Sequence, residues 1–378
     1  MNNIEPFEDP IYVTQPILPK LENLVEKLKE VWGSKRLTNN GPQHKRLEER
    51  LCDILKVPYL SLFNNGTIAL IVACQSLRLT GEVITTPFTF AATPHVLTWN
   101  NISPIFCDID PVTMNIDADK IESMITPQTT GILAVHVYGT PCDVKKIQEI
   151  ANRYGLKVVY DAAHAFGVEI DGKGIGTFGD VSMFSFHATK LFHTAEGGAL
   201  TFNDKNMKDR VDLLKNFGIK NEEEVMMPGI NGKMNELQAL LGLEVLGLVE
   251  EEKKKRRNIF LAYSNYLNGI EGIKICNNNS EDVNHNYQYV VIRVNEKEYG
   301  VSRDYLYTEL KKYNVHTRKY FYPLCSSFAC YKHLFSSIPA NLPIADKVST
   351  EVLCLPIYGE LNGYVIQNIC NIISDLKQ

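Results

Sequence analysis

An aspartate and a lysine follow two apolar segments whose composition is typical of buried strands. Asp161 comes directly after LKVVY (156–160), and Lys190 ends FSFHATK, shortly after VSMFSF (181–186). In a parallel α/β sheet, ligands bind at the carboxyl ends of the strands. Burial lowers the pKa of an amine and makes it a better nucleophile toward carbonyl groups. The pair therefore predicts carbonyl chemistry in a crevice of the protein, although either residue taken alone is more often structural.

The same two side chains match the needs of pyridoxal phosphate (PLP). That cofactor requires a lysine for its Schiff base and a carboxylate that keeps its pyridine nitrogen protonated. It also requires a phosphate site, and Asn65-Gly66-Thr67 lies between the predicted strand YLSLF and an apolar helix. Glycine allows close backbone approach, and a helix N-terminus offers free N–H groups. A plain turn with a helix cap is the alternative. Ser185 could add a hydroxyl to the same phosphate.

Two other patterns suggest different chemistry. Gly174-Ile-Gly176-Thr-Phe-Gly179 has the spacing of a dinucleotide fingerprint. A strand follows it where the fingerprint needs a helix, so we predict a turn over 171–176. Four histidines fall near strand ends: His136, His164, His187 and His193. We expect no metal site, because none of them pairs at i, i+4 with a carboxylate helix and no cysteine joins them at ligand spacing. His164 is better used as a partner near the cofactor ring.

The elements that must position these residues alternate along the chain. Strands are predicted at 59–63, 82–86, 104–108, 131–137 and 156–160, with helices near 44–55, 68–77, 91–99, 117–125 and 143–154. Short continuous apolar strands are typical of strands buried on both faces, which predicts a mostly parallel sheet covered by helices. Three more strands follow at 167–170, 181–186 and 198–202 with no full helix between them.

A different pattern begins near Asn235. One long helix is predicted from there past residue 257, and its run EEEKKKRR (250–257) should be a solvated helix face rather than a nucleic-acid patch. An alternating strand at 287–294, a helix at 303–313 and a terminal helix then suggest a smaller α+β domain. We expect a large domain over 34–245 and a small domain over 246–378. The N-terminal segment 1–33, with a helix at 21–31, should pack near the small domain.

The composition excludes several classes of protein. The chain has 378 residues, 44% of them apolar and 22% charged, and a formal charge of −5, which gives no general attraction to nucleic acids or anionic membranes. No apolar run reaches 18 residues, and no basic region precedes an apolar core at the N-terminus. Nine scattered cysteines without C-x-x-C fit reduced thiols. We expect a cytoplasmic protein with neither a nucleic-acid nor a membrane partner.

The segments that carry this chemistry resemble the DegT/DnrJ/EryC1/StrS family of PLP-dependent nucleotide-sugar aminotransferases. They are NNGTIAL, TTPFTFAAT, VHVYGTPCDV, YDAAHAFG, FSFHATKLFHTAEGGAL and GINGKMNELQALLGL, in family order. The resemblance runs from about residue 11 to the C-terminus. It implies the α/β fold of aspartate aminotransferase (fold type I), with a mostly parallel seven-stranded sheet between helices and a smaller α+β C-terminal domain. It also implies a homodimer.

The resemblance assigns roles around the cofactor ring. Lys190 is implied to be the Schiff-base lysine, and Asp161 to pair with the pyridine nitrogen. His164 stands where the family has Gln or His beside the ring hydroxyl. Phe90, in TFAAT, takes the place of the aromatic residue that stacks on the ring.

The resemblance also assigns the phosphate contacts. Gly66, Thr67 and Ser185 are implied to hold the phosphate. Asn231, in GINGKM, is implied to reach the phosphate of the neighbouring subunit's cofactor. The sequence departs from the family motif at Gly232-Lys233, where the family commonly has Arg or Tyr-Arg. This difference changes the contacts expected across subunits.

A second departure is Ala195, which stands before Glu-Gly-Gly where the family usually has glycine or a similar small residue. We see no reason for it to disable the site.

Other segments narrow the implied substrate. PIYVTQPILPKLE, RLTNNGP, SLFNNGTIAL and RKYFYPL are most similar to family members that make dTDP-4-amino-4,6-dideoxyglucose. The implied reaction moves the amino group of L-glutamate to C-4 of dTDP-4-keto-6-deoxyglucose, for a glycan such as an O-antigen. Arg318 and Lys319 are candidates to bind the diphosphate, because an arginine fork suits phosphate oxygens. A solvated basic pair is the alternative.

Three competing functions remain open. A C-3 keto-sugar aminotransferase would use the same residues and differ only in the shape of its pocket. A PLP-dependent 3-dehydrase has histidine in place of the family lysine, so Lys190 argues against it. A non-catalytic PLP-binding regulatory protein would not need the Asp161–Lys190 pair.

Overall fold

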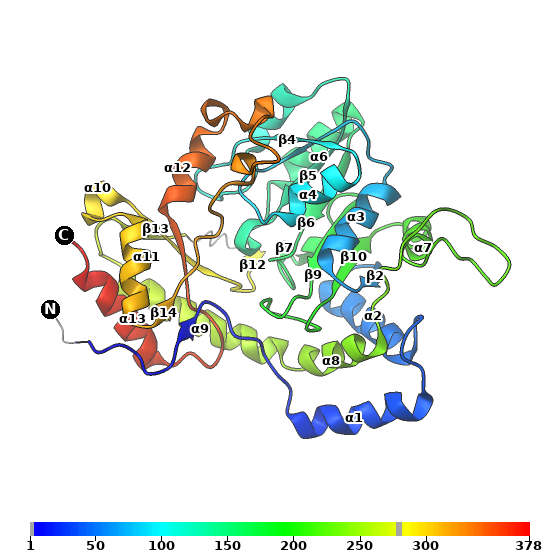
Figure 1. Ribbon diagram of the computed structural model, residues 1–378, viewed down its shortest axis with the longest axis horizontal. Helices are drawn as coiled ribbons and strands as arrows, with labels where there is room; N and C mark the ends of the chain where they lie inside the picture. The colour runs from blue at the N-terminus through cyan, green and yellow to red at the C-terminus, as the bar shows by residue number, and fades with distance from the viewer. Residues whose placement is uncertain (1–3, 277–281) are drawn as a thin grey trace.

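The computed structural model describes residues 4–276 and 282–378 (Figure 1). Its centre is a seven-stranded sheet in the order β2-β10-β9-β6-β5-β3-β4. The strands are β2 (Tyr59–Phe63), β3 (Glu82–Thr85), β4 (Ser103–Phe106), β5 (Thr129–Val135), β6 (Lys157–Asp161), β9 (Val181–Ser185) and β10 (Gly198–Phe202). All neighbours are parallel except that β10 runs antiparallel to β2 and β9. The predicted mostly parallel seven-stranded sheet is confirmed.

Both faces of this sheet are covered by helices. Successive side chains of a strand point to opposite faces, and in β6 Val158 and Tyr160 enter one core while Val159 enters another. The helices on the first face are α2 (Pro42–Leu55), α6 (Val144–Tyr154) and α8 (Glu236–Leu246). Those on the second face are α3 (Gly66–Ser76), α4 (Ala92–Trp99) and α7 (Lys205–Leu214). Burial on both faces explains why the strands are continuously apolar.

The helix predicted to run from Asn235 past residue 257 is two helices. The first, α8, begins at a reciprocal cap between the side chains and backbones of Asn235 and Gln238. It ends at Leu246, and two residues separate it from α9 (Val249–Leu267). The single-helix prediction is therefore wrong. Gly247 lies at the break, and glycine disfavours a continuous helix.

The charged run at the start of α9 is not wholly solvated, contrary to the prediction. Glu252 and Arg256 are buried, and Arg256 Nε donates to Glu252 Oε1 at 2.7 Å. Glu252 Oε1 also accepts the N–H of Gly359 at 2.8 Å. The two charges lie four residues apart on the inner face of the helix, where they neutralise each other.

A second core lies beyond the first half of α9. It contains the antiparallel sheet β11 (Ile273–Ile275), β13 (Val290–Val294) and β15 (Val352–Leu355), with α11 (Arg303–Lys312) and α13 (Gly363–Asp375). At the N-terminus, β1 (Ile11–Tyr12) pairs in parallel with β14 (Val315–His316) and extends this core. Helix α1 (Leu21–Ser34) lies beside α8 instead (Figure 1).

The glycine pattern at 174–179 begins at the end of a hairpin and is not followed by a nucleotide-binding helix. Strands β7 (Glu169–Ile170) and β8 (Lys173–Gly174) flank a turn at Asp171 and Gly172, where φ is positive. A short 3₁₀ helix (Ile175–Thr177) then leads into β9. The turn predicted over 171–176 is confirmed at Asp171 and Gly172 only, because the next residues form β8 and the 3₁₀ helix.

The remaining elements are short. They are α5 (Ala118–Ile121), α10 (Glu296–Tyr299), α12 (Pro343–Glu351), β12 (Val283–Asn284) and the 3₁₀ helices at Glu122–Met124, Val137–Gly139, Cys325–Ser327, Phe335–Ser337 and Pro339–Asn341. Within residues 4–276 and 282–378, no helix combines the length and the apolar character needed to cross a membrane.

Candidate active site

A cavity of about 580 Å³ gathers most of the predicted site residues. Those that line it are Gly66, Thr67, Phe90, Asp161, His164, Ser185 and Lys190. They come from the carboxyl ends of strands and the loops that follow, as expected for an α/β sheet. Tyr289, Tyr320 and Phe321 close the cavity from the C-terminal half of the chain. A volume of this size suits a small-molecule ligand.

Asp161 ends β6 and is held in a fixed orientation. Its Oδ2 accepts a hydrogen bond from the Thr93 hydroxyl at 2.8 Å, and its Oδ1 accepts the N–H of Ala163 at 3.1 Å. Burial raises the pKa of the Asp161 carboxyl, while these two hydrogen bonds and the positive charge of Lys190 act in the opposite direction. A cation beside this carboxylate would favour its ionised form.

Lys190 lies in the loop between β9 and β10. Its Nζ lies 3.5 Å from the hydroxyl of Tyr289. Burial lowers the pKa of this amine from 10.5 to about 8, and the Asp161 carboxylate opposes the shift. At pH 7 about a tenth of Lys190 is therefore neutral, and so nucleophilic, which is several hundred times the neutral fraction of an ordinary lysine, by roughly one factor of ten for each unit of pKa.

One ring nitrogen of His164 already accepts a hydrogen bond from the protein. Its Nδ1 accepts the N–H of Tyr138 at 3.2 Å, which places the ring proton on Nε2. The ring stacks on Phe321 with centroids 5.8 Å apart, and Tyr289 meets it edge-on at 5.0 Å. Burial and the charge of Lys190 lower the pKa of His164 well below its usual value. The side chain is a neutral hydrogen-bond donor.

The N-terminus of α3 forms a cradle at the cavity. The first four N–H groups of a helix have no acceptor within it. The Asn65 side chain accepts the N–H of Ile68 at 2.8 Å, and the regular helix bonds begin with the Ala69 N–H, which donates to the Asn65 carbonyl at 3.2 Å. The N–H groups of Gly66 and Thr67 are thus left for a ligand. A Cβ on Gly66 would lie 3.3 Å from the Cβ of Ser185, so glycine permits the close approach that brings Ser185 to the same place.

Three predicted residues do not line this cavity. Asn231 is exposed, and its Oδ1 accepts from the amine of Lys233 at 2.9 Å. Arg318 is exposed, and its backbone pairs with that of Cys354. Lys319 forms an ion pair with Asp304 at 2.5 Å.

The sequence did not single out Thr93 or Tyr289. Thr93 is the last residue of the segment TFAAT, and its role depends on the first turn of α4, which brings it to Asp161. Tyr289 lies in the alternating strand predicted at 287–294, where its aromatic type indicates only a buried position, and the structure places it directly before β13. The register of β13 decides which face it occupies, and a sequence pattern does not give that register.

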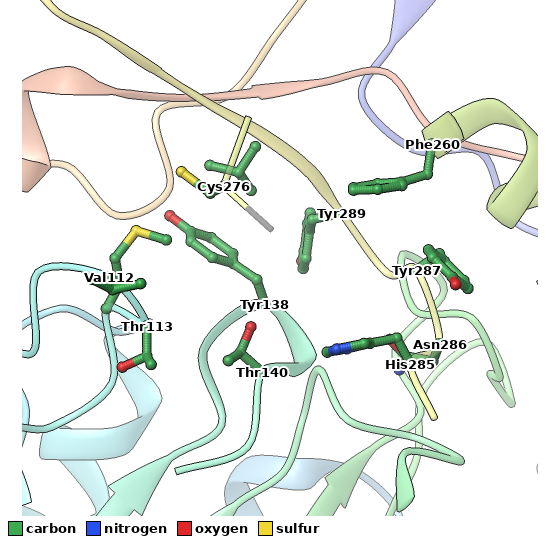
Figure 2. Close-up of a pocket in the computed structure, with 12 residues that line it drawn as sticks. Val112, Thr113, Tyr138, Thr140, Phe260, Cys276, His285, Asn286, Tyr287 and Tyr289 are labelled. Carbon is green, nitrogen blue, oxygen red and sulfur yellow. The ribbon is translucent and has the colours of Figure 1, made fainter. Parts of the chain in front are cut away.

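A second, smaller pocket of about 40 Å³ is lined in part by Tyr138 and Tyr289 (Figure 2). Tyr289 lines both spaces. Tyr138 and Tyr289 meet there edge to face, with ring centroids 5.8 Å apart. The smaller space has room for little more than ordered water.

The four histidines near strand ends do not gather. His136 stacks on Tyr160 in the core, His187 lies near Glu196, and the Nε2 of His193 lies 2.7 Å from the carbonyl oxygen of Ile17. In the part of the chain that the structure describes, no three His, Cys, Asp or Glu side chains are grouped as metal ligands.

Two transaminases are similar to this chain over nearly its whole length. A dTDP-4-amino-4,6-dideoxy-D-glucose transaminase from Escherichia coli is 49% identical over 366 residues, which covers 96% of this chain and 98% of the relative. One from Shigella dysenteriae is 46% identical over 371 residues, covering 98% and 100%.

Solved structures of sugar aminotransferases share the fold. DesI, determined in the presence of its TDP-sugar product, matches with a TM-score of 0.93 at 33% identity, covering 98% of this chain and 94% of the other. Helicobacter pylori PseC, an aminotransferase of pseudoaminic acid biosynthesis, matches with a TM-score of 0.90 at 28% identity, covering 98% and 99%.

The model of the DegT/DnrJ/EryC1/StrS aminotransferase family matches residues 20–374, nearly the whole chain. The match includes every residue that lines the main cavity. The chain therefore belongs to the DegT/DnrJ/EryC1/StrS aminotransferase family.

Proposed function

We propose that this protein transfers the amino group of L-glutamate to C-4 of dTDP-4-keto-6-deoxyglucose, giving dTDP-4-amino-4,6-dideoxyglucose for glycan biosynthesis. The observation that carries the proposal is the cavity that joins the Lys190 amine, the Asp161 carboxylate and the N-terminus of α3. The two relatives at 46% and 49% identity, both named for this product, support the choice of substrate.

The residues of the cavity fit PLP. When bound, PLP supplies an aldehyde that takes an amino group from the donor and passes it to the keto-sugar, and a ring that withdraws electrons. Lys190 would hold it, and Asp161 would keep the ring nitrogen protonated. The free N–H groups of Gly66 and Thr67, with the Ser185 hydroxyl, would bind the phosphate. His164 would donate from Nε2 to the ring oxygen, and Phe90 would cover one ring face.

Lys190 would also move the proton at each half of the reaction. Its lowered pKa, about 8, leaves the amine able to accept a proton from the donor's Cα and to return it later. Tyr289 and the aromatic residues Tyr320 and Phe321 would limit the access of water to that transfer.

We propose that the active form is a homodimer in which Asn231 serves the partner's site. Asn231 lies outside the cavity of its own chain, on the segment between α7 and α8. That segment exposes large apolar side chains, as a surface covered by a second copy would: Phe217, Ile219, Val225, Met226 and Ile230. Its backbone pairs with the chain just before the phosphate cradle, because Asn64 N–H donates to the carbonyl of Gly232 at 2.9 Å.

For the nucleotide, we propose that Arg318 meets the diphosphate. It lies two residues before Tyr320, which lines the cavity, and its side chain is exposed. Lys319 already pairs with Asp304 and lies over the ring of Tyr307, so it would have to leave both to bind a phosphate. Arg318 is therefore the stronger candidate.

Two further assignments of the chain remain proposals. We propose a domain division at 245/246, at the last residue of α8 and just before α9, with the second core belonging to the small domain. We also propose a cytoplasmic location, which the nine unpaired cysteines support.

One experiment tests the proposed function. Purified protein is incubated with PLP, L-glutamate and dTDP-4-keto-6-deoxyglucose, and the product is identified by mass spectrometry and NMR. An amine on C-4 is the expected result, and the Lys190→Ala variant is the control for background chemistry. Turnover of the 3-keto isomer alone would overturn the regiochemistry, and no amine with either sugar would overturn the substrate class.

A further inference from the structure

One short segment, residues 286–289, contacts both loops that carry the ring-binding side chains. It leads into β13 of the second core. Asn286 Nδ2 donates to the carbonyl oxygens of His164 at 2.8 Å and Phe166 at 3.0 Å. Its Oδ1 accepts the N–H of Gln288 at 3.1 Å, so the segment is braced within itself. Figure 2 shows Asn286, Tyr287 and Tyr289 along this part of the chain.

Gln288 contacts the peptide groups on either side of Lys190. Its Oε1 accepts the N–H of Leu191 at 2.7 Å, and its Nε2 donates to the carbonyl of Thr189 at 3.2 Å. The side chain is only 1% exposed. A carboxamide presents one acceptor and two donors, so a single glutamine satisfies both peptide groups as a neighbouring strand would.

Lys190 depends on such support because its loop lacks regular structure. No helix or strand lies between β9 and β10. The N–H of Lys190 itself donates to the carbonyl of His187 at 2.9 Å, which is a local turn. The far end of the lysine meets Tyr289, the residue after Gln288. One segment therefore holds both the backbone of Lys190 and its amine.

We propose that Gln288 is a positioning residue for Lys190, whose amide fixes the two flanking peptide groups so that Nζ stays at the Tyr289 hydroxyl inside the cavity. The inference rests on the proposed role of Lys190 as the cofactor lysine. Gln288 touches neither the cavity nor the amine, so it acts through the backbone alone.

The physical consequence is a change in the proton affinity of the amine. Surroundings poor in water lower the pKa of Lys190. If the loop is released, the amine gains access to water and its pKa rises toward the ordinary value. The neutral fraction at a given pH then falls by about tenfold for each unit of that rise.

To test this, the rate at which PLP attaches to the apoprotein is measured by stopped-flow absorbance between about pH 6 and pH 10. The rate follows the neutral amine, so its midpoint reports the pKa of the lysine. Gln288→Met removes both hydrogen bonds without adding charge. We expect its midpoint to rise by about one unit and attachment near pH 7 to slow about tenfold. Hydrogen exchange at the Leu191 amide should also accelerate.

A matched control is Asn115→Leu. Asn115 is 2% exposed, and its amide also brackets a loop, donating to the carbonyls of Thr140 at 3.0 Å and Pro141 at 2.8 Å. It should lose stability with no change in the midpoint. If Gln288→Met does not fold, Gln288→Asn keeps the amide but is one methylene too short to reach both partners, and it should shift the midpoint in the same direction.

The inference is overturned if the folded Gln288 variants keep the wild-type midpoint, or if Asn115→Leu shifts it equally. Borohydride reduction followed by peptide mass mapping of the wild type separates this inference from the proposed function. If the cofactor is found on Lys190 but the Gln288 variants keep the wild-type midpoint, only the role of Gln288 is wrong. If the cofactor is found on another lysine, the assignment of Lys190 as the cofactor lysine is wrong.

Discussion

The hydroxyl of Thr93 donates a hydrogen bond of 2.8 Å to Oδ2 of Asp161. Thr93 lies in the first turn of α4 and Asp161 ends β6, so two elements far apart in the sequence set the direction of one carboxylate. The N–H of Ala163 holds the other oxygen. A carboxylate fixed in advance does not have to reorient when a positive ring approaches it, which is the condition for strong electrostatic stabilisation.

Asp161→Asn should remove most of the activity and leave the fold intact. An amide can keep both contacts, with its oxygen accepting the Ala163 N–H and its NH₂ donating to the Thr93 hydroxyl, but it is neutral and cannot hold a protonated pyridine nitrogen. We expect kcat for the glutamate half-reaction to fall by about 100-fold or more, of the order seen for other electrostatic stabilisers. Stopped-flow absorbance of the PLP-loaded variant measures this.

Unfolding of the same preparation separates the two explanations for Asp161. If the residue only secures the loop after β6, the variant should unfold at lower urea concentration while the folded protein keeps its specific activity. A stable variant with little activity supports the charge role.

The sheet and the centre of the site could be predicted because they depend on local patterns. Continuous apolar strands predict burial on both faces, and the strand-end positions of Asp161 and Lys190 place both in one crevice. The break at Gly247 and the inward charges of Glu252 and Arg256 could not be predicted in the same way. Both depend on what packs against α9, and a window of sequence does not contain that information.

Ala195 shows the same limit at a single residue. The sequence showed alanine in place of the usual family glycine, and the structure gives the reason for the glycine. The φ angle of Ala195 is +62°, in the left-handed region that favours glycine. The two hydrogen bonds of Gln288 beside Lys190 likewise depend on the approach of a segment far along the chain, since Gln288 lies 97 residues from Leu191.

His164 should act as a neutral donor over the physiological pH range. Its Nδ1 is occupied by the Tyr138 N–H, and its pKa is far below the ordinary value. We expect His164→Gln, which keeps a donor, to bind PLP within about threefold of wild type. His164→Ala should lose about tenfold, or about 1.4 kcal/mol. Fluorescence titration of the apoprotein with PLP gives both affinities.

The pH dependence gives an independent test of the same residue. Because the folded pKa lies below the unfolded one, His164 stays neutral as the pH falls through about 6.5. The PLP affinities of the wild type and of His164→Gln should therefore depend on pH in the same way at about pH 6.5. A step in the wild type that His164→Gln abolishes would mean that the imidazole is charged in the folded protein.

The buried ion pair of α9 should be a stability element. Glu252→Gln leaves the fully buried Arg256 without its charge partner, and breaking a buried pair typically costs about 3–5 kcal/mol. Urea unfolding should show a large fall in the midpoint. The neighbouring Glu251→Gln, at an exposed position, should change stability by less than about 0.5 kcal/mol.

The double variant Glu252→Gln with Arg256→Met tests the cause. Removing the second charge should restore much of the stability, since replacing a buried pair by apolar groups is often nearly neutral. No recovery would show that Gly359, whose N–H bonds to Glu252, matters more than the charge of Arg256.

Asn231 and Lys190 should complement each other across subunits. If Asn231 serves the partner's phosphate, a mixed dimer of Asn231→Ala and Lys190→Ala chains contains one intact site. Random exchange makes about half of the dimers mixed, so about a quarter of wild-type activity should return. Activity is measured after mixing, and subunit exchange is followed separately with differently tagged chains. Exchange without recovery would place Asn231 in its own subunit's site or outside the site.

Arg318→Ala should weaken binding of the nucleotide-sugar alone. An arginine that binds the diphosphate contributes to the keto-sugar half-reaction, and glutamate carries no diphosphate. We expect the KM for the sugar to rise tenfold or more, at least about 1.4 kcal/mol, while the glutamate half-reaction barely changes. Both half-reactions are measured by stopped-flow absorbance on the same preparation.

Lys319→Ala is the control for the Arg318 prediction, because it removes an adjacent positive charge that is already paired with Asp304. Its KM for the sugar should rise much less than that of Arg318→Ala. Equal effects of the two variants would mean that general positive charge, rather than an arginine fork, attracts the nucleotide. Equal damage by Arg318→Ala to both half-reactions would instead indicate a contact with the glutamate carboxylates or a loss of folding.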